Sequence, residues 1–131
     1  MDAEAICYLP LHELATQLRV GKLSSVEVTR GILERIHRVN PRLHAYLTVL
    51  DESALNRAAQ ADAEIGAGRW RGPLHGVPVA VKDLCQTKGV LTTCASSVLR
   101  DWRPDSSATC NIAPTAPRSW WTWICCAGAC N

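Results

Sequence analysis

The apolar run Val77–Val81 constrains the fold of this 131-residue chain more than any other feature. It is short and rich in β-branched residues, and turn-forming residues bound it, with Gly72-Pro73 and Gly76 before it and Gly89 after it. Such a run predicts a strand that is buried on both faces. Lys82 follows the run directly. Because burying an unpaired ammonium costs several kcal/mol, this lysine must be paired, exposed at the strand end or neutral.

Of these three states, only the neutral amine acts as a base. The alternative is structural, because a lysine at a strand terminus usually extends its ammonium to water. Asp83, the next residue, would then be its ion-pair partner at the surface. The strand pattern alone fits both interpretations of Lys82.

Helical periodicity predicts helices ahead of this strand. The first one stops at Gly21, and its apolar positions are Leu11, Leu14, Ala15 and Leu18. Ser24 and Glu27 form the Ser-x-x-Glu capping box of the second helix, and Pro41 is expected to end it. The apolar stripe of this second helix is Val28, Ile32, Ile36 and Val39, and the residues expected to face away from it are Thr29, Arg35 and Arg38.

Two further elements complete the pattern before the apolar run. The segment from Ala45 to Leu50 has the length and composition of a strand. A third helix follows, which Asp51 or Ser53 caps and which runs through Ile65. Helices ahead of a core strand place the chain in the α/β class.

Charge and cysteine content favour a cytoplasmic protein. The net charge of +2 comes from interspersed signs and the basic residues form no patch, so we expect no nucleic-acid binding. Met1–Ala5 carries acidic residues and no basic stretch leading into an apolar one, so a secretory signal is not expected. The seven cysteines have no framework spacing and fit reduced thiols.

No metal or cofactor is expected from the motifs. The four histidines are scattered without metal-ligand spacing, which favours surface or hydrogen-bonding roles for His12, His37, His44 and His75. The sequence contains no Gly-x-Ser-x-Gly elbow, no phosphate-binding glycine loop and no His-Glu-x-x-His motif. Hydrolase chemistry in this chain therefore cannot rest on a histidine triad.

Several stretches occur in an order that is typical of one enzyme family. They are Gly21–Ser25, Asn40–Tyr46, Ala58–Ala63, the Gly-Pro-Leu-His-Gly-Val-Pro strand entry with Lys82, and Lys88–Ser97. In this order, over about residues 11 to 109, the chain resembles the amidase signature family. The resemblance implies an α/β fold in which this chain is an N-terminal fragment, with helices followed by the first strands of a mixed sheet.

The resemblance also implies the chemistry, which is the hydrolysis of carbon–nitrogen bonds in small-molecule amides by a Ser-Ser-Lys triad without a cofactor. Lys82 matches the family's neutral lysine, which accepts a proton from a serine held by a cis peptide bond. That serine in turn deprotonates the nucleophilic serine, and backbone N–H groups of a glycine-rich loop stabilise the oxyanion.

By the same resemblance, both serines and the glycine-rich loop lie farther from Lys82 than the 49 residues that follow it here. We therefore expect Lys82 to be the only triad member present and the chain to be inactive alone. Ser96 and Ser97 lie in a stretch where relatives have a structural turn, and neither lies in a glycine-rich loop. We do not expect either of them to be the nucleophile.

The tail differs from the rest of the chain, which divides it into a partial amidase domain (1–109) and a Trp- and Cys-rich tail (110–131) that we expect to be irregular and disordered. Our hypothesis for its origin is a frameshift after Thr109. Alternatively, the tail cysteines could bind zinc, but they lack Cys-x-x-Cys pairs. These cysteines are Cys110, Cys125, Cys126 and Cys130. The tryptophan-rich stretch is too short to cross a membrane, and we expect no membrane binding.

Two other functions remain open at this stage. By resemblance, the chain could instead be a fragment of the A subunit of an aminoacyl-tRNA amidotransferase. That subunit uses glutamine and acts beside partner subunits on charged transfer RNA. It could also be a non-catalytic interaction module built on the helices and the tail. The substrate and the oligomeric state are not readable from the sequence.

Overall fold

The computed structural model describes residues 3–107 and 122–126 of the chain. Within these residues the helices that precede the first strand are α1 (Ala3–Ile6), α2 (Leu11–Arg19), α3 (Ser25–Leu43) and α4 (Asp51–Gly66). After them come strand β1 (Pro78–Lys82), the short 3₁₀ helix η1 (Ser97–Leu99) and strand β2 (Thr122–Cys126). This order confirms the predicted α/β fragment, in which helices lead into the first strand.

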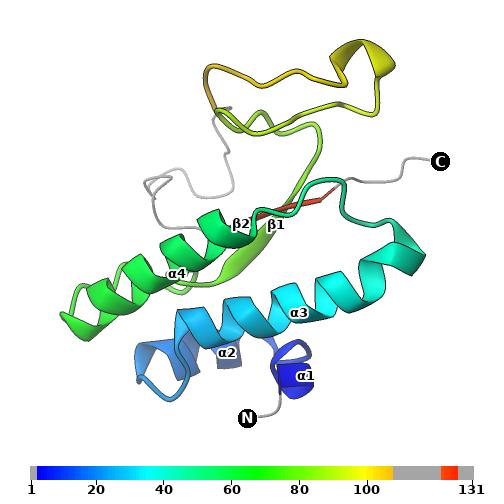
Figure 1. Cartoon of the computed structure of the whole chain (residues 1–131). Coiled ribbons are helices and arrows are strands. Elements are labelled where there is room, and N and C mark those ends of the chain that lie inside the picture. The colour runs from blue at the N-terminus through cyan, green and yellow to red at the C-terminus, as the bar shows by residue number, and fades with distance from the viewer. Residues whose placement is uncertain (1–2, 108–121, 127–131) are drawn as a thin grey trace.

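The helices and the strand pair form adjoining layers (Figure 1). α3 packs against α4, and α1 lies against α3. The strand pair contacts α4 through β2 and α3 through β1. After β1, residues 83–107 form a long excursion away from the helices (Figure 1). In the described ranges, no helix combines the length and apolarity needed to cross a membrane.

The end of α2 and the start of α3 follow the predicted signals. Gly21 has a φ of +70°, and the N–H of Lys22 after it donates to the carbonyl of Gln17 at 3.0 Å, which closes the end of α2. At the start of α3, the Glu27 N–H donates to Ser24 Oγ at 3.0 Å and the Ser24 N–H donates to the Glu27 carboxylate at 3.2 Å. The predicted capping box is therefore present.

The expectation that Pro41 ends the second helix is wrong, because α3 continues to Leu43. Proline removes one backbone donor and its ring crowds the carbonyl four residues earlier, but its fixed φ is compatible with helix, and α3 continues past it only as far as Leu43. The N–H of His44 donates to the carbonyl of Asn40 at 2.7 Å and closes that turn. His44 itself has a φ of +49°, the left-handed conformation that ends many helices.

The predicted strand at 45–50 is also wrong, since this segment forms no strand. The side chain of Asn40 binds the backbone of Tyr46 instead, accepting its N–H at 2.8 Å and donating to its carbonyl at 2.9 Å. The third helix forms as α4, but neither predicted residue caps it, because Asp51 is its first residue and Leu50 has no side-chain cap. Asp51 instead contacts His37 at 2.6 Å.

β1 and β2 pair in parallel, from Pro78 opposite Thr122 to Lys82 opposite Cys126. The expectation of an irregular tail is therefore wrong for Thr122–Cys126, while the rest of the tail lies outside the described residues. The expected burial of the first strand on both faces is wrong as well, because Ala80 is exposed and Val81 is only half-buried. Among the described residues β1 has a single neighbouring strand, and one neighbour cannot cover a whole strand.

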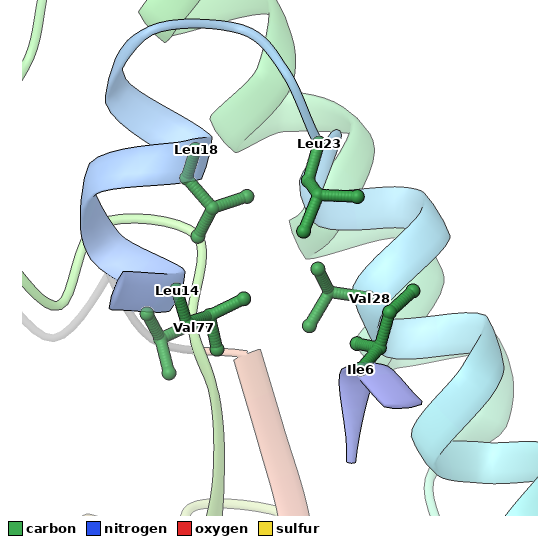
Figure 2. Packing of buried hydrophobic residues seen from close by; sticks show 6 residues of the cluster. All are labelled: Ile6, Leu14, Leu18, Leu23, Val28 and Val77. Carbon is green, nitrogen blue, oxygen red and sulfur yellow. The ribbon is translucent and has the colours of Figure 1, made fainter. Parts of the chain in front are cut away.

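A small apolar core joins α1, α2 and α3 to the residue before β1. Figure 2 shows the side chains of this core pointing toward one another, and they are Ile6, Leu14, Leu18, Leu23, Val28 and Val77. A second cluster lies between α3 and α4, formed by Leu33, Ile36 and Ala54. Thr29 was expected to face away, but it is completely buried. The helix layer therefore packs directly against the start of β1.

Candidate functional site

Lys82 is the last residue of β1, at the point where the long excursion begins. The predicted strand forms, and this residue ends it. Its side chain is exposed. Base chemistry needs a neutral amine, and desolvation is what favours the neutral form of a lysine. The described residues therefore leave Lys82 exposed at the end of the strand.

Asp83, the next residue, is not a surface carboxylate, because only 7% of it is exposed. Its Oδ1 accepts the N–H of Thr93 at 2.9 Å, and its Oδ2 accepts the Thr93 hydroxyl at 2.5 Å and the N–H of Ala95 at 3.4 Å. Its carbonyl accepts the N–H of Cys94 at 3.1 Å. The residue after Lys82 therefore fastens the end of β1 to the turn at 93–96.

This turn has an unusual backbone. Cys94 and Ala95 have φ values of +50° and +54°. Residues other than glycine rarely adopt φ values in this left-handed region. Such conformations persist where surrounding contacts hold them, and the Asp83 hydrogen bonds supply those contacts here. The turn and the strand end are thus one hydrogen-bonded unit.

Ser96 and Ser97 have structural positions in the same segment. The N–H of Ser96 donates to the carbonyl of Thr93 at 2.9 Å, and its hydroxyl accepts the N–H of Val98 at 3.3 Å, which caps η1. Ser97 is exposed as the first residue of that short helix. The Ser96 hydroxyl thus serves as a helix cap, and the expectation that neither serine is the nucleophile stays a prediction.

Sequence reasoning missed a buried polar cluster at the entry to β1. His75 is 2% exposed, and its Nε2 lies 3.0 Å from the carboxylate of Glu64. Its Nδ1 accepts the N–H of Arg71 at 3.3 Å, while the Arg71 guanidinium donates to Glu64 at 2.6 Å. The ring of Trp70 packs against the imidazole with centroids 5.7 Å apart.

Burial lowers the pKa of His75, and the nearby Glu64 carboxylate opposes that shift. Because Nδ1 accepts a hydrogen bond, the neutral ring carries its proton on Nε2 and donates it to Glu64. The hydrogen-bonding role expected for His75 is therefore present, although its burial was not foreseen. Glu64 belongs to α4 and His75 follows eleven residues later, and no local sequence pattern identifies the two as partners.

A second missed group links the two long helices to the strand entry. The carboxylate of Asp62 accepts the N–H of Ser25 at 2.6 Å and the N–H of Val26 at 3.0 Å, which are unsatisfied donors at the start of α3. The hydroxyl of Ser25 donates to the carbonyl of Gly76. Asp62 lies four residues after buried Ala58, so helical spacing placed its carboxylate on the inner face of α4.

In residues 3–107 and 122–126, no group of three or more His, Cys, Asp or Glu side chains is arranged to hold a metal ion. Cys7, Cys85 and Cys94 are free thiols. The zinc alternative for the tail falls on cysteines outside the described side chains, so it stays untested.

Residues 27–111 match the Amidase family, a stretch that includes Lys82, Asp83 and the turn they hold. The chain belongs to this family. It is 45% identical over 109 residues to the Mycobacterium bovis protein AmiD, named as an amidase, and 48% identical over 101 residues to the A chain of the Glutamyl-tRNA(Gln) amidotransferase of Geobacter metallireducens. These alignments cover 83% and 77% of the chain.

A solved structure agrees with this assignment. The peptide amidase of Stenotrophomonas maltophilia superposes with a TM-score of 0.68 and 36% identity, over 75% of this chain and 20% of that one. The curated relatives are likewise matched over 23% and 21% of their own lengths. The chain therefore corresponds to the N-terminal part of the amidase fold and spans about a fifth of such proteins.

Proposed function

We propose that this chain supplies the lysine of an amidase active site, with Lys82 as the proton acceptor for the hydrolysis of an amide bond. The observation that carries the proposal is that the family match includes Lys82 at the end of β1, with Asp83 fastening that strand end to a turn. The nucleophile, the bridging serine and the surface that desolvates the lysine would come from segments that relatives carry beyond this region.

A chimera tests the role of the lysine. Residues 11–109 of this chain would replace the matching segment of the Stenotrophomonas maltophilia peptide amidase, and ammonia release from a peptide amide would be measured. Removing a proton acceptor typically costs 10²- to 10⁴-fold in rate, so Lys82→Ala in the chimera is expected to lower kcat by about that factor. Lys88→Ala, at an exposed lysine in the following segment, is the matched control.

Two results would count against the proposal. One is a Lys82→Ala chimera that releases ammonia as fast as the unsubstituted chimera. The other is a cooperatively folded chimera that keeps Lys82 and yet shows no turnover. The unmodified chain, incubated with simple amides and a serine-directed fluorophosphonate probe, is expected to give neither turnover nor labelling.

A second function is the one carried by the amidotransferase relatives, and the 48% identity over 101 residues to the Geobacter metallireducens protein supports it about as well as the 45% over 109 residues supports the amidase. In that case the amide is glutamine, and the partners are the other chains of the amidotransferase and charged transfer RNA. To test this function, residues 11–109 of this chain would replace the matching segment of the Geobacter metallireducens protein. This chimera is expected to release ammonia from glutamine, whereas a chimera that carries the matching segment of an amidase is not.

We also propose a cytoplasmic location. The free thiols of Cys7, Cys85 and Cys94 support it, since reducing compartments keep thiols unpaired. Fractionation of cells that express the chain, with a periplasmic or secreted signal as the contrary result, tests this location.

A further inference from the structure

A groove separate from Lys82 runs along α3. Its volume is about 290 Å³, and its apolar wall consists of Ile32, Ile36, Val39 and Leu43, with Tyr46 from the segment after α3 also lining it. The α3 residues are spaced by four, three and four positions, so they share one face of the helix. None of the lining residues belongs to β1 or to the turn at 93–96. The groove is therefore not part of the proposed amidase site.

The polar groups in the groove are not equally available. Asn40 already exchanges two hydrogen bonds with the backbone of Tyr46. The Cys7 thiol donates to the carbonyl of Gly31 at 3.9 Å, and burial raises the pKa of this thiol, so it stays neutral. This leaves the guanidinium of Arg35 as the charged group that lines the groove.

Arg35 is held in a fixed position. Its Nη2 donates to the hydroxyl of Tyr8 at 2.8 Å, its carbon Cζ lies 4.8 Å from the centre of the Tyr8 ring, and its Nη1 lies 3.4 Å from the Glu4 carboxylate. A guanidinium offers five donors, and these contacts use only part of them. A ligand in the groove would therefore meet an ordered cation at one side.

The charge along this side is positive. Arg35 lines the groove, and Arg38 and Arg42, which follow at spacings of three and four residues, continue one ridge along the same side of α3. Glu4 contacts the first two, at 3.4 Å and 3.7 Å, and is itself more than half exposed. Glu34, four residues before Arg38, adds a second carboxylate beside the ridge, so three cations face two carboxylates and the edge next to the apolar wall keeps a net positive charge.

We propose that this groove binds a small amphipathic carboxylate, with its apolar chain along α3 and its carboxylate at the ridge formed by Arg35, Arg38 and Arg42. The volume lies just below the roughly 300–1,000 Å³ of sites for drug-sized ligands, so the ligand is a short-chain molecule. The apolar wall selects the chain, and the ridge selects a negative head group over a neutral one.

Octanoate is the probe, and backbone amide shifts of the purified chain in NMR titrations are the measurement. We expect saturable shifts along Ile32–Leu43 and at Tyr46, with octanol binding more weakly. Exposed ion pairs contribute up to about 1 kcal/mol, so the double variant Arg38→Gln/Arg42→Gln is expected to weaken octanoate binding about threefold to fivefold. Both arginines are exposed, so the fold should persist.

Two further variants separate the apolar and the charged parts. Leu43→Gln removes exposed apolar wall and should weaken octanoate and octanol alike. Arg30→Gln, on the opposite side of α3, should change neither affinity and is the matched control. Raising the salt from about 0.1 M to about 1 M should weaken octanoate binding alone, because screening acts on the charge. Equal affinities for octanoate and octanol, shifts mapped away from α3, or no saturable shifts would each overturn the proposal.

Discussion

Replacing Gly76 with alanine tests whether the helix layer and the start of β1 form one tightly packed unit. Gly76 has a φ of +81°, and a Cβ built there would lie 3.1 Å from both Cβ and Oγ of Ser25 and 3.4 Å from Cβ of Ala61. The left-handed conformation costs a residue with a side chain about 1–2 kcal/mol. That cost applies to any glycine with such a φ.

The crowding adds a second cost, because Ser25 cannot move aside. Ser25 is completely buried, its N–H is bonded to Asp62 at 2.6 Å, and its hydroxyl is bonded to the Gly76 carbonyl. Overpacking of this kind typically costs about 1–3 kcal/mol. Gly76→Ala is therefore expected to lower the free energy of unfolding by about 2–5 kcal/mol.

Gly68→Ala is the matched control, because Gly68 has a φ of +74° and nothing lies within 4 Å of the Cβ it would gain. It should lose only the conformational part, about 1–2 kcal/mol. Urea unfolding followed by circular dichroism gives both values, with a stabilising osmolyte added equally to all samples to keep the weaker variant measurable. Equal losses for the two variants would refute the packing argument at Ser25.

Three further predictions concern the buried polar groups. Asp62→Ala removes the acceptor of two N–H groups at the start of α3, so urea unfolding should show a loss of about 2–3 kcal/mol, and a loss below that of Glu27→Gln would contradict it. Because the pKa of His75 is lowered in the folded chain, the folded state binds fewer protons than the unfolded state. The stability that neutral His75 contributes is therefore fully present above the unfolded pKa of about 6.5, and it is lost as the pH falls through the lower folded pKa. His75→Gln should flatten that part of the stability–pH curve, and an unchanged curve would rule out His75 as its source. Asp83→Asn keeps only one carbonyl acceptor, so hydrogen exchange at the amides of Thr93 and Ala95 should accelerate, while Asp105→Asn, at an exposed position, should leave it unchanged.

Features that depend on neighbouring residues were predictable from the sequence. The capping box at Ser24 and Glu27 and the stop at Gly21 involve residues within a few positions, and the structure confirms both. The strand leading to Lys82 was readable from its apolar run between glycines. In each case the free energy that selects the conformation lies within one turn of helix or one short strand.

Contacts between distant segments were not predictable in the same way. Asp62 reaches donors 36 and 37 residues earlier, and nothing in its local pattern identifies Ser25 and Val26 as its partners. The errors at 45–50 and at Pro41 have a related cause. At 45–50, the hydrogen bonds between Asn40 and Tyr46 hold a non-strand conformation despite the strand-like composition. At Pro41, the bond from the His44 N–H to the Asn40 carbonyl closes the last turn of α3 despite the helix-breaking tendency of proline.

Lys82 shows where these two kinds of information separate. Its place at a strand end follows from local pattern, and the buried carboxylate of Asp83 fixes the backbone that carries it. Its proposed role as a base would require desolvation, which depends on what covers the strand. In the described residues β1 has one neighbour and Lys82 is exposed. A sequence motif can therefore identify this lysine and its family, whereas the proposed role as a base also depends on contacts at the end of β1 that the local sequence does not specify.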